Sequence, residues 1–209
     1  MTLGALKRFA QGPPPPQRPE DERCEMCATP LEPAHSHVVN VETRRLICTC
    51  RACYLLFLPQ GAAAGKIRAV PERYRRDPGF RLDETTWAAL QIPVRTAFFF
   101  KNSHLGKAVA FYPSPAGATE SQFATGAWDD LVATNPVLAE LESDVEAVLV
   151  HARRGEPLEC YLVPINACYE LVGRVRLHWR GFDGGEEAWR EIDGFFATLR
   201  ERCEEVPAP

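Results

Sequence analysis

Cysteines dominate the chemistry that this sequence offers. Cys24 and Cys27 form one CxxC pair, and Cys50 and Cys53 form a second pair after 22 intervening residues. A tight turn between two cysteines aims both sulfurs at one point about 2.3 Å away, and two such turns complete a tetrahedron. This spacing is typical of the knuckle pair of a zinc ribbon or treble clef. The four cysteines are therefore the predicted metal ligands.

A fifth cysteine, Cys48, lies two residues before Cys50. Residues i and i+2 of an extended strand share a face but do not curl round one ion. We therefore expect Cys48 to be a spare, buried thiol beside the site. Two alternatives remain open, since Cys48 could replace Cys50 as a ligand or could hold a second metal. His35 and His37 are possible ligands of a mixed site, although such histidines more often lie on a hairpin surface.

Zinc is the favoured metal, and iron is the alternative. Rubredoxin holds one iron with the same CxxC pairs, so spacing alone does not separate the two metals. The residues between the cysteines, Glu25–Met26 and Arg51–Ala52, lack the Pro and Gly usual in rubredoxin knuckles. Four bound thiolates leave no coordination position open. The metal would therefore be structural or redox-active rather than hydrolytic.

A second group of residues raises the question of nucleic-acid binding. The segment 72–81 places four arginines next to two aromatic side chains, namely Arg73, Arg75, Arg76 and Arg81 with Tyr74 and Phe80. Basic and aromatic residues together can bind single strands. However, the net charge is −4, so we favour a solvated loop whose arginines pair with nearby acids. No Ser-His-Asp, paired-carboxylate or P-loop pattern is visible, and a non-enzymatic role is the more natural expectation.

The composition is that of a protein with its own hydrophobic core. The 209 residues are 45% hydrophobic, enough to bury a core without relying on a metal throughout. The sequence begins without the apolar run of a secretory signal, and its longest apolar run, YLLFLP, is far shorter than a membrane span. We therefore expect a cytoplasmic protein with no membrane span. Eight cysteines in that compartment favour metal binding over disulfides.

The chain divides into four parts. Residues 1–21 hold a possible short helix at 2–10 and a Pro-rich spacer, and residues 22–60 form the four-cysteine module with a hairpin at 37–48. Residues 61–83 form an extended connector. The last part, 84–209, is the larger domain.

Hydrophobic patterning in the larger domain predicts two hairpins and four helices. Asp83 is a helix N-cap before 84–90, and a second helix covers 126–136. Strands are expected at 94–100, 107–113, 145–153 and 159–165. An apolar stripe from Cys168 to Trp179, and another from Trp189 to Leu199, predict two C-terminal helices. The predicted fold class is thus α+β: a zinc-ribbon or treble-clef-like module, then an antiparallel sheet with helices packed on one side.

Several strings in the sequence resemble an uncharacterised family common in actinobacteria. They are CEMC, RRLICTCRAC, AVPERYRRDPGF, AFFFKNS, VAFYPSPAGATES and RLHWRGFDGGEEAWREIDGFFATLR. Members of that family are encoded beside oxygen-tolerant NiFe-hydrogenases, and the resemblance covers residues 22–202. It implies an accessory role with hydrogenase subunits as partners, in assembly or in complex stability. It carries over no catalytic residues.

Overall fold

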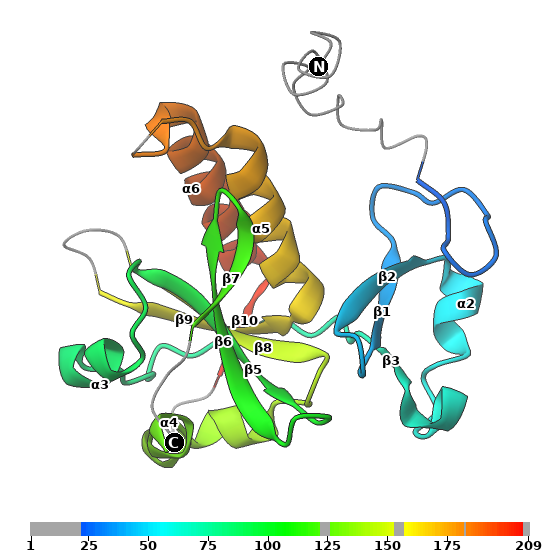
Figure 1. Ribbon diagram of the computed structural model, residues 1–209, viewed down its shortest axis with the longest axis horizontal. Coiled ribbons are helices and arrows are strands. Elements are labelled where there is room, and N and C mark those ends of the chain that lie inside the picture. Colours follow the sequence, from blue (N-terminus) through cyan, green and yellow to red (C-terminus); the bar gives the residue numbers. More distant parts are fainter. Residues whose placement is uncertain (1–21, 122–125, 153–156, 182, 207–209) are drawn as a thin grey trace, which may run out of the picture.

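Two sheets organise the protein, one small and one large. The computed structural model describes residues 22–121, 126–152, 157–181 and 183–206. Within these ranges a three-stranded sheet precedes a seven-stranded one (Figure 1). The α+β class is confirmed, as is the order of a four-cysteine module followed by a mainly antiparallel sheet domain. The predicted helix at 2–10 and the Pro-rich spacer lie outside the described residues.

The small sheet is built on the predicted hairpin. Its strands are β1 (Ser36–Asn40), β2 (Arg45–Thr49) and β3 (Ile67–Ala69), in the order β2-β1-β3. A short helix, α2 (Arg51–Leu55), follows β2 directly, and η2 (Ala62–Gly65) precedes β3. The buried hydroxyl of Tyr54 donates a hydrogen bond to the Val70 carbonyl at 3.0 Å. This bond fastens α2 to the end of β3, so the first part of the expected connector belongs to the small sheet.

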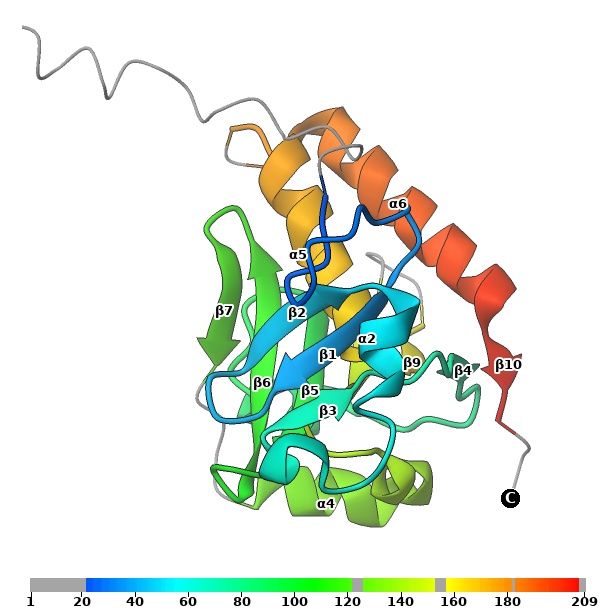
Figure 2. The same ribbon diagram turned by 90° about the vertical axis from the view of Figure 1, so that its right-hand side faces the viewer.

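The large sheet has the order β10-β4-β9-β8-β5-β6-β7. Its strands are β4 (Arg75–Arg76), β5 (Thr96–Asn102), β6 (Lys107–Ser114), β7 (Gly117–Ser121), β8 (Glu146–His151), β9 (Glu159–Pro164) and β10 (Glu204–Glu205). All neighbours are antiparallel except β10 and β4. Figure 2 shows β10 at the edge of the molecule, beside β4. The connector thus gives one strand to each sheet.

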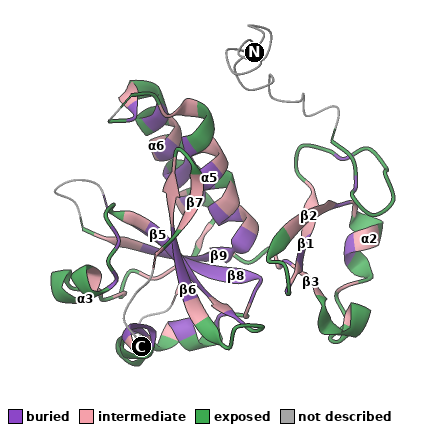
Figure 3. Ribbon diagram, in the orientation of Figure 1, coloured by how far each residue is buried: buried purple, intermediate pink, exposed green. Residues whose placement is uncertain are grey.

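The central strands are buried on both faces of the large sheet. In β5, Phe98 and Phe100 join one apolar cluster, whereas Ala97 and Phe99 join the other. Successive side chains of a strand point to opposite faces, so a continuous apolar run needs cover on both. Figure 3 shows the buried residues concentrated in these strands and on the facing sides of the helices.

The two faces of the large sheet are covered by helices of different length. The long helices α5 (Ile165–His178) and α6 (Gly185–Arg202) pack on one face, as predicted. The opposite face carries smaller elements, namely α3 (Glu84–Ala89), α4 (Ala127–Thr134) and η3 (Pro136–Glu140). The expectation of helices on one side therefore holds for α5 and α6. It does not include the smaller helices α3, α4 and η3, which lie on the opposite face. The reason is the second apolar face of β5 and β8, which Trp128, Leu131 and Leu138 cover.

Candidate metal centre

The first cysteine pair lies in a tight turn ahead of β1. The Ala28 amide donates to the Cys24 carbonyl at 2.8 Å, and the Cys24 amide donates to the Thr29 carbonyl at 2.8 Å. Ala28 has a φ of 60°, in the left-handed region that reverses the chain. Because the backbone curls back on itself here, the thiols of Cys24 and Cys27 can face the same point.

The second pair lies where β2 gives way to α2. Cys50 is the N-cap of α2, and Cys53 lies within the helix. Residues three apart on a helical turn lie on the same face, so both thiols project from one side of this turn. The order of knuckle, β-hairpin and helix is that of a treble clef.

The four predicted sulfurs lie together. The Sγ atoms of Cys24, Cys27, Cys50 and Cys53 are all within 4.8 Å of one another, and Cys27 Sγ lies 3.6 Å from Cys50 Sγ. Sulfurs at the corners of a tetrahedron about 2.3 Å from a metal would be about 3.8 Å apart. All four thiols are free rather than paired in disulfides. The donor set and its spacing therefore fit one tetrahedral ion of the kind that thiolates bind.

Glu25, between the first two cysteines, fastens the knuckle to β2. Its amide donates to the Cys48 carbonyl at 3.0 Å, and its Oε1 accepts from the Cys48 amide at 2.9 Å. Its other carboxylate oxygen pairs with the guanidinium of Arg45. These contacts hold the first knuckle against the strand that leads to the second one. The sequence alone does not indicate this role for Glu25, because its partners depend on how the hairpin folds back.

Without metal, the thiols of the cluster differ in acidity. Hydrogen bonds with the side chain and backbone of Thr29 lower the pKa of Cys27 to about 6. A hydrogen bond with Cys27, together with desolvation, raises the pKa of Cys53 to about 12. Desolvation opposes ionisation of Cys24, but hydrogen bonds from the backbone of Cys50, Met26 and Cys27 outweigh it and lower the pKa. Cys27 is thus the first thiolate, and a bound cation would displace the remaining protons.

Cys48 does not belong to the set of four. Its side chain instead groups with His35 and His37, with one ligand atom of each within 4.8 Å of the others. His37 lies directly opposite Cys48 in the pairing of β1 with β2. Burial lowers the pKa of His37 to about 4, and repulsion from His35, whenever that ring is protonated, acts in the same direction. Burial and the carboxylates of Glu22 and Glu25 raise the pKa of Cys48.

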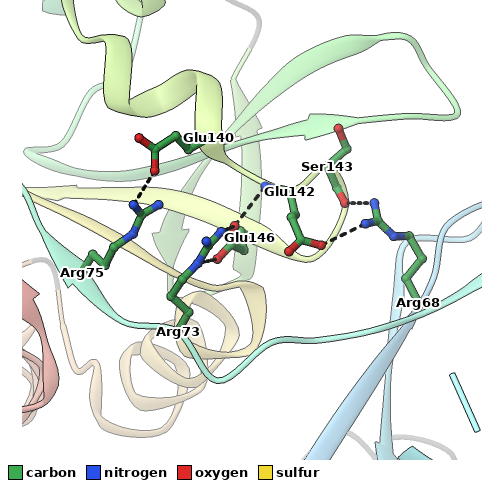
Figure 4. Close-up of polar contacts among 7 residues, drawn as sticks. All are labelled: Arg68, Arg73, Arg75, Glu140, Glu142, Ser143 and Glu146. Carbon is green, nitrogen blue, oxygen red and sulfur yellow. Dashed lines mark hydrogen bonds and ion pairs between the residues drawn. The ribbon is translucent and has the colours of Figure 1, made fainter. Parts of the chain in front are cut away.

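The arginine-rich segment packs against acidic residues (Figure 4). Arg73 forms two hydrogen bonds with Glu146, and Arg75 pairs with Glu140 at 2.6 Å. Arg76 lies 3.5 Å from a carboxylate oxygen of Glu159 and 3.7 Å from one of Glu205. Arg81 differs from these three because its side chain is exposed, while its backbone amide and carbonyl form hydrogen bonds with the Asn135 side chain. These four arginines therefore do not form an open basic surface.

No helix in the described ranges combines the length and the apolar character that a membrane span needs. In comparisons with known proteins, no curated protein and no solved structure matches the chain. A family profile does match, over residues 23–203, which include the small sheet, both cysteine pairs, both long helices and every strand of the large sheet except β10. The chain therefore belongs to the family described as "Family of unknown function (DUF5947)".

Proposed function

We propose that the four cysteines bind one structural zinc ion and that the protein acts as an accessory or interaction protein of a NiFe-hydrogenase. The observation that carries the zinc assignment is the four-sulfur cluster, whose Cys27–Cys50 separation of 3.6 Å fits a tetrahedral thiolate site. Four thiolates fill the coordination shell of zinc, so the ion would hold the module together rather than perform chemistry.

Exposed apolar side chains on the same module support an interaction role. Four of its large hydrophobic residues reach solvent, namely Met26, Leu55, Leu56 and Leu58, with Leu56 66% exposed. Met26 lies in the first knuckle, and the leucines lie in and just after α2. Exposed apolar groups gathered on one small module favour contact with another protein. The hydrogenase as that partner rests on the sequence resemblance.

Copurification tests the accessory role. Tagged full-length protein, isolated from the organism that encodes it, should retain hydrogenase subunits, and deletion of the gene should impair hydrogenase maturation. Leu56→Asp should weaken retention, because it puts a charge in the exposed apolar group. Leu177→Asp is the matched control, since Leu177 is an exposed leucine on α5, 54% accessible. Absence of hydrogenase subunits together with normal maturation would refute this role.

Iron is the second candidate, with electron transfer as the function. Its support is the exposure of Cys27, because an exposed ligand would bring a redox centre to the protein surface. An iron-loaded protein would show sulfur-to-iron charge-transfer colour. Metal analysis of protein purified under conditions that retain iron separates the two candidates. A colourless preparation with one zinc in the four-cysteine cluster would exclude the electron carrier.

A further inference from the structure

A second set of metal-ligating side chains lies on the hairpin, beside the four-cysteine cluster. His37 on β1 and Cys48 on β2 are directly opposite each other, and His35 precedes His37 by two residues. Side chains two residues apart point to the same side of an extended chain, and directly opposed residues share a face. One ligand atom from each of the three residues accordingly lies within 4.8 Å of the other two.

The hydrogen bonding of His35 determines which ring nitrogen can bind a metal. Nδ1 lies 2.9 Å from the Glu32 carbonyl oxygen. Because a carbonyl only accepts, Nδ1 carries the proton and Nε2 carries the lone pair. Metal-binding histidines are commonly oriented in this way, with the second ring nitrogen donating to a backbone carbonyl.

Within the part of the chain that the structure describes, no donor satisfies the lone pair of His35 Nε2. It is buried and without a hydrogen-bond partner among the described residues, in a side chain that is only 10% exposed. A buried acceptor without a donor is costly and calls for a specific explanation. A cation held between this nitrogen, the His37 ring and the Cys48 thiolate supplies one.

We propose that His35, His37 and Cys48 bind a second divalent transition-metal ion of the zinc class, separate from the ion of the four cysteines. Imidazole and thiolate are the ligands that zinc prefers. Three protein ligands leave a fourth coordination position for water or another small ligand, unlike the saturated four-cysteine site. This second site goes beyond the proposed accessory function and does not depend on the identity of the protein partner.

A cavity borders the two histidines of the proposed site, and Cys48 is not among its lining residues. His35 and His37 line a cavity of about 490 Å³ together with Tyr74, Asn166 and Arg202 from the larger domain. Tyr74 lies directly before β4, Asn166 lies in α5, and Arg202 is the last residue of α6. A small ligand bound to the metal would therefore lie between the module and the larger domain.

Cobalt titration of the full-length protein tests the proposal. Reduced, metal-free protein should bind about two Co²⁺ per chain, and Cys48→Ser and His37→Gln should each bind about one. The signal lost in Cys48→Ser should include thiolate-to-cobalt absorption of about one quarter of the intensity that the four-thiolate site gives. The matched controls are Cys203→Ser and His104→Gln, which lie outside both clusters and should keep two ions.

The four-cysteine site reports whether a variant has folded, because its cobalt spectrum requires an intact module. A wild-type protein that binds one ion, or a Cys48→Ser variant that still binds two, would overturn the second site and leave the structural zinc intact. Loss of both ions from Cys48→Ser and from His37→Gln, with the amides of β1 and β2 still protected from hydrogen exchange, would also overturn it, by showing that these residues serve the first site. Failure of the wild-type protein to bind any ion would refute both proposals.

Discussion

Arg73 donates two hydrogen bonds to the buried carboxylate of Glu146, from Nε to Oε1 at 2.8 Å and from Nη2 to Oε2 at 2.6 Å. The Glu146 side chain is only 1% exposed, and it also accepts from the Glu142 amide at 2.9 Å. Two parallel bonds to one carboxylate are the strongest form of this pairing. Because Arg73 lies between β3 and β4, the pair fastens the link between the two sheets to the start of β8.

Arg73→Ala should destabilise the protein, because it leaves the buried Glu146 without its cation. We expect the free energy of unfolding to fall by about 2–3 kcal/mol, measured by urea denaturation. This is less than for a fully buried pair, because the Arg73 side chain is itself 42% exposed. The matched control is Arg95→Ala, whose ion pair with Glu84 is exposed on both sides. Arg95→Ala should lower the free energy of unfolding by less than about 1 kcal/mol. Equal losses for the two variants would contradict a stabilising role of the Arg73–Glu146 pair.

If the four cysteines hold the proposed structural zinc, its removal should unfold the small module and spare the large sheet. After chelation, or in Cys50→Ser, amides of β1, β2 and α2 should lose protection from hydrogen exchange, while those of β5 and β8 remain protected. The larger domain should also lose some stability, because Val39 of β1 and Val70, directly after β3, pack into its main apolar cluster. Cys203→Ser should leave the pattern unchanged. Uniform loss of protection in both sheets would mean that the metal supports the whole fold.

Helix α5 carries one buried leucine, Leu171, and one exposed leucine, Leu177, whose substitutions can be compared. Leu171 of α5 is fully buried between the sheet and α6, whereas Leu177 is 54% exposed. Leu171→Ala should lower the free energy of unfolding by about 2–4 kcal/mol, through lost transfer energy and the cavity that remains. Leu177→Ala should change it by less than about 1 kcal/mol. Thermal or urea unfolding measures both, and a small effect at Leu171 would place α5 outside the core.

Two glycines at the start and the middle of α6 should respond to alanine in opposite directions. Gly184 has a φ of +90°, and a Cβ there would lie 3.0 Å from ring atoms of Trp179. Gly184→Ala should therefore destabilise the protein by about 1–3 kcal/mol. Gly194 is helical, and a Cβ there would meet nothing within 4 Å. Gly194→Ala should stabilise it by about 0.5–1 kcal/mol. Matching effects in urea unfolding would contradict this account of the turn.

Sequence patterns predict those helices and strands whose own residues favour that secondary structure. The β5–β6 hairpin follows from two apolar, aromatic runs around a polar turn, and α5 and α6 follow from their apolar stripes. In contrast, β4 and β10 are two residues each and carry only Arg75–Arg76 and Glu204–Glu205. Acidic residues are uncommon in strands. These strands form because distant segments pair with them, and local patterning does not encode that pairing.

The two candidate metal sites also differ in how far the sequence predicts them. The two CxxC spacings predict the four-sulfur cluster, since each pair is brought together by a local turn. The grouping of Cys48 with His37 depends on the register of β1 against β2, and a shift of one residue would place them on opposite faces. Spacing along the chain does not fix that register. The sequence therefore leaves the role of Cys48 open, with a spare thiol as the favoured reading.

The position of β4 between β9 and β10 has a mechanical consequence. The chain that leaves the small sheet enters the large one within a few residues, and both edges of β4 are hydrogen-bonded. If a bound protein pulled on the module, the force would act on the hydrogen bonds that join β4 to β9 and β10. A flexible linker in the same place would simply extend. Force applied near the cysteines would be transmitted into the large sheet through the Arg73–Glu146 pair and through the ladder formed by β9, β4 and β10.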